Sequence, residues 1–227
     1  MSKPLDFLKG KKVFIFDTET NGLPLKKPNT KWGTRDEYYD YFNNDGYDSS
    51  RIISIAWFYT NNFQQDTLDI NSVQYYIVQP DENLKEINNS HIHNITYDIA
   101  KEQGLDFENI LSKQLQNNLL ESDYIIAHNV MFDIHILLNQ LHRNKKTNII
   151  SHINTLLDNN QCICSGEIGK TICKLEFPNS KYPKKFKTNY KMPKLEEFYK
   201  IIMNKDIQNS HNAQGDVQSL LEIFSKI

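Results

Sequence analysis

The sequence predicts one α/β domain in which helices cover both sides of a mixed β-sheet. Two observations lead to this prediction. Strand-like segments come first along the chain, and strand-like and helix-like segments then alternate, an order typical of mixed sheets between helical layers. The chain has 227 residues, 39% of them hydrophobic, which is enough for one full core and too few for two. We therefore expect a single domain over residues 1–227, without an internal repeat or a linker.

Five strands are expected. The first, at 12–17 (Lys-Val-Phe-Ile-Phe-Asp), is a short apolar run that ends in an acid, as in a central strand buried on both faces. The second and third, at 51–59 and 72–78, are rich in β-branched and aromatic residues. The fourth lies at 124–128, and a weaker fifth is expected near 171–175.

Helices are expected near 98–103 and 106–120, and directly after the fourth strand, with an apolar stripe of Met131, Ile134, Leu138 and Leu141. Two more helices lie at 193–203, with a proline early in its first turn, and at 213–224. The last helix has one apolar face, formed by Ala213, Val217, Leu220, Leu221 and Phe224. Asp216 lies immediately beside that face.

The composition is that of a globular protein in a reducing compartment. Residues 1–12 are polar and carry lysines, unlike a signal peptide, and no run approaches the roughly 20 apolar residues that span a bilayer. The three cysteines, Cys162, Cys164 and Cys173, are an odd number, which argues against a disulfide framework. We expect an intracellular protein, cytoplasmic or nuclear, without a membrane partner.

Two segments are too irregular to be simple connections. Residues 24–50 are too long for an ordinary loop between strands. They form either a packed insertion, such as a helix over the sheet edge, which we favour, or a flap whose rings stack on nucleobases. Their aromatic residues are Trp32, Tyr38, Tyr39, Tyr41, Phe42 and Tyr47.

The second irregular segment, 161–192, carries most of a run of positive charge. Eight lysines lie between Lys170 and Lys194, with a single acid, Glu176, among them. Such a run is either a solvated loop or a basic rim that a phosphate backbone would contact.

Acidic residues gather first in the phrase Phe-Asp-Thr-Glu-Thr-Asn-Gly-Leu at 16–23. Asp17 and Glu19 are two residues apart on the first strand, so their side chains point the same way. Two such carboxylates are costly to bury without a cation, and oxygen ligands suit Mg²⁺ or Mn²⁺. The alternative is a pair of acids on a solvated strand face, which the apolar run before them disfavours.

Two later phrases supply further acids and a histidine. His-Asn-Val-Met-Phe-Asp at 128–133 places Asp133 at the start of a helix, where it either faces the first pair or simply stabilises the helix N-terminus. His-Asn-Ala-Gln-Gly-Asp at 211–216 places His211 before the last helix and Asp216 in its first turns. A histidine beside bound metals can take a proton from an attacking water, whereas a lone one is usually a capping or surface residue.

These phrases resemble the three motifs of DnaQ-like, or DEDDh, 3′–5′ exonucleases, which belong to the ribonuclease H-like superfamily. The matching residues are Asp17-Thr18-Glu19-Thr20-x-Gly22-Leu23, His128-Asn129-x-x-Phe132-Asp133 and His211-x-Ala213-x-x-Asp216. A histidine five residues before the last Asp is the spacing of this subgroup. The resemblance covers nearly the whole chain and implies a ribonuclease H-like fold, with a five-stranded mixed sheet flanked by helices.

The resemblance also implies an activity, namely release of nucleoside 5′-monophosphates from a 3′ end with two divalent ions, Mg²⁺ or Mn²⁺, as cofactors. Asp17, Glu19, Asp133 and Asp216 would hold the ions, and His211 would be the general base. The terminal nucleotide would be contacted by Thr20, Leu23, His128, Asn129 and Phe132.

The implied substrate is the single-stranded or frayed 3′ end of a nucleic acid. DNA is expected, in proofreading or repair, and 3′-end trimming of RNA is the alternative. A polymerase or a second copy of the chain would be the protein partner in such a role.

Two other functions are weighed against this one. A nucleic-acid-binding subunit with little activity would usually have lost a metal ligand, and none of the five residues is missing. Zinc binding through the three cysteines lacks a clear fourth ligand, His152 being the one candidate. Three reduced thiols are favoured.

Overall fold

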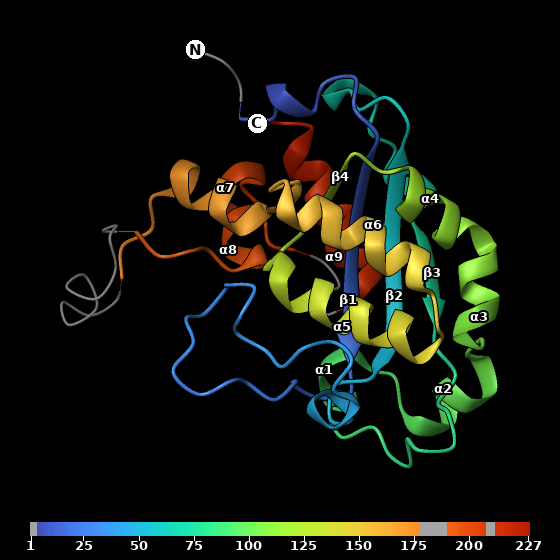
Figure 1. Cartoon of the computed structure of the whole chain (residues 1–227). Helices are drawn as coiled ribbons and strands as arrows, with labels where there is room; N and C mark the ends of the chain where they lie inside the picture. The colour runs from blue at the N-terminus through green and yellow to red at the C-terminus, as the bar shows by residue number, and fades with distance from the viewer. Residues whose placement is uncertain (1–3, 178–189, 208–211) are drawn as a thin grey trace.

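The computed structural model describes residues 4–177, 190–207 and 212–227, and within them the chain forms a five-stranded mixed sheet (Figure 1). The strands are β1 (Val13–Thr20), β2 (Ile52–Thr60), β3 (Gln74–Ile77), β4 (Tyr124–Ala127) and β5 (Cys162–Cys164). Their order across the sheet is β3-β2-β1-β4-β5. β2 is antiparallel to both β1 and β3, whereas β4 is parallel to both β1 and β5. The predicted fold class is confirmed.

The predicted position of the fifth strand is wrong. Residues 171–175 lie at the end of helix α7 (Ser165–Cys173) and just beyond it, and β5 instead pairs Cys162–Cys164 with Ile125–Ala127 of β4. The β-branched run near 171 contributes to a helical face, because Ile168 and Ile172, four residues apart, both pack on the core beside the last helix.

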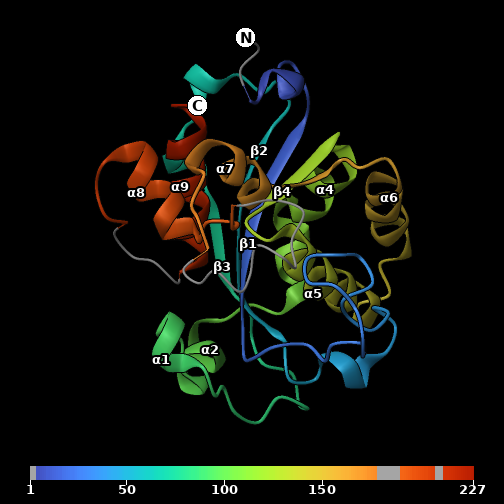
Figure 2. The ribbon, with the colours of Figure 1, turned by 90° about the vertical axis from the view of Figure 1, so that its left-hand side faces the viewer.

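The side chains of β1 alternate between two cores, one on each face of the sheet. Phe14 and Phe16 pack against α4 (Gln116–Glu121), α5 (Val130–Arg143) and α6 (Thr147–Asp158). Val13 and Ile15 pack against α8 (Leu195–Met203) and α9 (Ala213–Phe224). Figure 2 shows these two helical layers on opposite sides of the sheet. Every side chain on β1 therefore faces one layer or the other according to its position along the strand.

The helices after β3 differ in part from the prediction. α2 (Tyr97–Gln103) is as expected, but the helix predicted at 106–120 is interrupted between α3 (Phe107–Ile110) and α4. The break lies at Gln114, whose φ of 75° is not helical. α1 (Ser90–His93) and α6 are additional helices, and α6 has an apolar face that the sequence does contain, at Ile149, Ile150, Ile153 and Leu156.

The aromatic insertion packs on α5 through part of its length. Tyr38 and Tyr47 are buried in the core on the α5 side, whereas Trp32 and Phe42 are exposed. The insertion contains a single 3₁₀ turn, Asn44–Tyr47, and no helix that covers a sheet edge. The prediction of a packed insertion is therefore right for Tyr38 and Tyr47. The predicted helix over the sheet edge is wrong.

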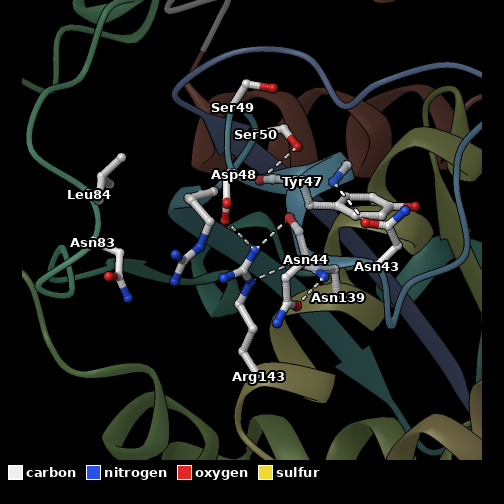
Figure 3. A network of polar contacts seen from close by, with 12 residues as sticks. Asn43, Asn44, Tyr47, Asp48, Ser49, Ser50, Asn83, Leu84, Asn139 and Arg143 are labelled. Atoms are coloured by element: carbon white, nitrogen blue, oxygen red, sulfur yellow. Dashed lines mark hydrogen bonds and ion pairs between the residues drawn. The ribbon is translucent and has the colours of Figure 1, made fainter.

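Polar contacts hold the second half of the insertion in place. Arg143 on α5 donates to the Asn44 carbonyl oxygen at 2.9 Å and to Asp48 Oδ1 at 2.7 Å, and its Nε donates to Asn139 Oδ1 at 2.8 Å (Figure 3). Asn139 in turn donates to the Tyr41 carbonyl oxygen at 2.7 Å. These bonds fix residues 41–48 to the same helix that carries Asp133.

Within the described ranges, no helix is long and apolar enough to cross a membrane.

Candidate active site

Three of the predicted carboxylates meet at the C-terminal end of β1, beyond its pairing with β4. Asp17 and Glu19 share the face of β1 that is covered by α9, and Asp216 lies in the first turn of α9. One carboxylate oxygen from each of the three lies within 4.8 Å of the others, and each residue is partly buried. Three convergent oxygens of this kind form a site that could hold a divalent metal ion.

Asp133 reaches the same strand end from the opposite helical layer. It lies in the first turn of α5 and is 3% exposed. Thr18 belongs to the alternate face of β1 and donates to Asp133 Oδ1 twice, from its backbone nitrogen at 3.1 Å and from Oγ1 at 2.8 Å. Because Oδ1 accepts both bonds, Thr18 fixes the orientation of the carboxylate.

Burial and neighbouring charges raise the pKa values of three of these carboxylates, Asp17, Glu19 and Asp133. Burial raises the pKa of Asp17 well above its usual value, and the charges of Asp133, Asp216 and Glu19 raise it further. Burial, and then the charge of Asp133, raise the pKa of Glu19 to about 7. Burial likewise raises the pKa of Asp133 to about 7, although the two bonds from Thr18 act in the opposite direction. A bound cation would compensate these charges, so the donor set fits a divalent metal.

His128 joins three segments beside these carboxylates. Its Nε2 donates to the Pro193 carbonyl oxygen at 3.0 Å, and its Nδ1 lies 3.0 Å from Ser165 Oγ. Burial lowers the pKa of the imidazole, which favours the neutral ring. With both nitrogens in contact with protein groups, His128 links the end of β4 to the starts of α7 and α8.

Asn129 follows His128 and adopts the left-handed conformation, with a φ of 63°, just before α5. Asparagine tolerates this conformation better than most residues. It allows the chain to leave β4 and enter α5 with Asp133 in the first turn.

The other predicted nucleotide contacts differ in their exposure. Leu23 is 69% exposed, whereas Thr20 is buried, with its hydroxyl donating to the Gly22 carbonyl oxygen at 2.6 Å. Gly22 is required here because a Cβ would collide with the Ser49 carbonyl oxygen. Phe132 is partly buried and contacts the Tyr38 ring edge-on, with ring centroids 6.3 Å apart. His211 lies outside the described residues.

Asn212 is a site residue that the sequence analysis did not single out. Its Oδ1 accepts from the backbone nitrogens of Gln214 at 3.0 Å and Gly215 at 3.4 Å, and so caps α9 four residues before Asp216. The signal was present, since asparagine immediately before an apolar helix is a common N-cap.

The cysteines do not gather into a metal-binding cluster among the residues that the structure describes. Asp17, Glu19 and Asp216 are the metal-ligating side chains that do cluster within the described ranges. The three cysteines are free thiols. The Nε2 atom of His152, the candidate fourth ligand, lies 3.0 Å from the Ser122 carbonyl oxygen.

The sequence profile of the RNase_T exonuclease family matches residues 14–224. The chain belongs to this exonuclease family. The match includes every carboxylate of the site, and it confirms the resemblance drawn from the three motifs. No curated protein sequence matches this chain significantly.

Solved structures share the fold of this chain at low sequence identity. Two are chains of E. coli exonuclease I. The zinc-bound complex with single-stranded DNA has a TM-score of 0.62 and 14% identity, covering 96% of this chain and 40% of that one. The complex with a dT13 oligonucleotide has a TM-score of 0.59 and 15% identity, covering 95% of this chain and 40% of that one. This chain therefore spans less than half the length of exonuclease I.

A third similar structure is S. pombe Pop2p in its Mg²⁺- and Mn²⁺-bound form. Its TM-score is 0.55 at 18% identity, covering 98% of this chain and 84% of that one. At such identities the likeness shows a common fold.

Proposed function

We propose that this chain is a metal-dependent 3′–5′ exonuclease, which hydrolyses the terminal phosphodiester bond of a nucleic acid and releases a nucleoside 5′-monophosphate. The observation that carries the proposal is the meeting of Asp17, Glu19 and Asp216, with Asp133 held beside them by Thr18. Four carboxylates drawn from three distant segments, in a member of an exonuclease family, favour this chemistry over a binding role.

Asp17, Glu19, Asp133 and Asp216 would hold two divalent ions, Mg²⁺ or Mn²⁺. When bound, such ions lower the pKa of a water molecule and neutralise charge on the scissile phosphate and the departing 3′ oxygen. His211 is proposed as the general base that accepts the proton of the attacking water, a role assigned from its motif. Thr20, Leu23 and Phe132 would position the terminal nucleotide, with Leu23 as the exposed apolar contact.

Unpaired DNA is the first substrate class to test, because the exonuclease I structures of the same fold hold single-stranded DNA. An RNA 3′ end is the alternative substrate. The described residues include no separate element for reading base sequence, so we expect selection for free, flexible ends.

The test is digestion of 5′-labelled single-stranded DNA, duplex DNA and single-stranded RNA with Mg²⁺ or Mn²⁺, with wild type beside Asp17→Asn. We expect a ladder that shortens from the 3′ end and that is weakened at least about 100-fold in the variant, because loss of a carboxylate ligand weakens the metal site. The order of the cleavage rates on these three substrates then identifies the preferred class of nucleic acid.

Asp98→Asn, a change on the first turn of α2 away from the site, is the matched control and should cleave like wild type. Binding of all three strands without cleavage by the wild-type protein, in either metal, would contradict the proposal and favour a binding subunit.

A further inference from the structure

We propose that Trp32 is the stacking platform of a groove that binds unpaired nucleotides upstream of the 3′ terminus. This inference rests on the proposed function for the position of the terminus, since it extends the substrate path away from the carboxylates. Trp32 lies in the insertion after β1, which runs on the same side of the molecule as α7 and α8 (Figure 1).

Two adjoining hollows define the groove. The first, of about 390 Å³, begins at Asp216 and is bordered by His128, Asn129 and Pro193. The second, of about 670 Å³, continues along α7 past Cys164 and Ile168. The two hollows share three of their lining residues, Trp32, Asn129 and Met192. The second hollow is thus a continuation of the path that starts at the proposed metal site.

The lining of the groove suits bases. Trp32 is 53% exposed, so its ring is available for stacking, to which every nucleobase can contribute a face. Across the groove, Met192 packs against Gly166 so closely that a Cβ on Gly166 would lie 2.6 Å from its sulfur. Met192 also lies 3.8 Å from the sulfur of Cys164. This thioether wall is polarisable and apolar, as in other sites that contact aromatic groups.

The occupant must be an unpaired strand. Bases can enter an apolar groove and stack on Trp32 only when they are not paired with a second strand. Their phosphates would then lie at the rim, where Lys31 is exposed beside Trp32 and the exposed Lys194 borders the hollow next to Asp216. A duplex presents its phosphates and hides its base faces, so it would leave the groove empty.

Fluorescence can report this contact directly, because the chain has two tryptophans and Trp57 is fully buried. In an Asp17→Asn background, which prevents cleavage, titration with single-stranded oligothymidylate or oligouridylate should quench the emission of Trp32. Blunt duplex DNA should not. Trp32→Ala should weaken binding of the single strands about 5- to 100-fold, whereas Trp32→Phe should retain most of it.

Phe42→Ala is the matched control, since Phe42 is an exposed aromatic of the same insertion but does not line the groove. It should bind like the parent protein. Absence of quenching, or equal losses in the Trp32 and Phe42 variants, would overturn the inference.

A kinetic comparison separates the groove from the proposed catalytic site. The p-nitrophenyl ester of thymidine 5′-monophosphate fills the terminal position and lacks an upstream strand. Trp32→Ala should lower kcat/KM about 5- to 100-fold for an oligonucleotide and leave the ester unaffected, whereas an equal fall for both substrates would overturn the inference. Quenching without hydrolysis of either substrate would sustain the groove and overturn the exonuclease proposal.

Discussion

At the residue scale, Thr18 holds Asp133 toward the carboxylates of β1 through two hydrogen bonds to Oδ1. Asp17 and Glu19 could be placed on one side of a strand because the side-chain period of a strand is two. The same period puts Thr18 on the other face, but its bond to Asp133 spans 115 positions. That contact depends on how α5 packs against β1, so the residue pattern alone could not reveal it.

Thr18→Val tests whether this contact positions Asp133. The change keeps the shape of the side chain and removes the 2.8 Å bond to Oδ1 while the backbone bond at 3.1 Å remains. We expect activity or affinity for Mn²⁺ to fall about 10- to 100-fold, as for other groups that orient a metal ligand. Isothermal titration with Mn²⁺ and the oligonucleotide ladder are the two measurements.

The control for Thr18 is Thr155→Val on α6, whose hydroxyl donates to the Ser151 carbonyl oxygen far from the site. It should leave Mn²⁺ affinity unchanged. Thr18→Ser keeps a hydroxyl that can donate to Asp133 Oδ1, so it should retain much of the activity and Mn²⁺ affinity that Thr18→Val loses. Wild-type metal affinity in Thr18→Val would show that the backbone bond suffices.

At the scale of elements, four of the five strands were predictable and the short edge strand β5 was not. β1 and β2 have long apolar runs that leave little choice of structure, whereas β5 has three residues and forms because β4 offers an open edge. Helix α7 includes residues 171–173 because Ile168 and Ile172 pack against the core on that side of the sheet. For the insertion, the aromatic content alone could not separate Tyr38 and Tyr47, which pack on α5, from the exposed Trp32 and Phe42.

Arg143→Leu tests how the insertion is held on α5. Loss of the guanidinium leaves the Asn44 carbonyl oxygen and Asn139 without a donor and removes the ion pair to Asp48. We expect the free energy of unfolding to fall by about 1–3 kcal/mol, as measured by urea denaturation followed by circular dichroism.

Arg35→Leu is the comparison for Arg143, because Arg35 also forms an ion pair, with Asp158, but its side chain is 47% exposed against 15% for Arg143. An exposed pair contributes at most about 1 kcal/mol. Equal effects of the two substitutions would mean that the network in Figure 3 adds nothing beyond a surface ion pair.

At the scale of the whole molecule, the carboxylates link stability to pH and to metal. Burial and mutual repulsion raise the pKa values of Glu19 and Asp133 to about 7, above those of roughly 4 in an unfolded chain. An acid whose pKa is raised by folding favours the folded state below its unfolded pKa, and that contribution is lost as the pH rises through the folded value. The metal-free protein should therefore lose stability between about pH 4 and pH 7 through these groups.

Glu19→Gln isolates this effect, because it removes one repelling charge at nearly constant shape. In the presence of EDTA we expect the variant to exceed wild type in the free energy of unfolding by roughly 1–3 kcal/mol at pH 8, and to match it near pH 4. Mn²⁺ should reverse the order at pH 8, because it stabilises the folded wild-type protein by binding, and the variant has lost a ligand. Urea denaturation at the two pH values, with and without Mn²⁺, gives all four comparisons. If metal-free wild type were instead the more stable protein at pH 8, the carboxylates would be compensated within the chain itself, and the fold would not depend on a cation to hold them together.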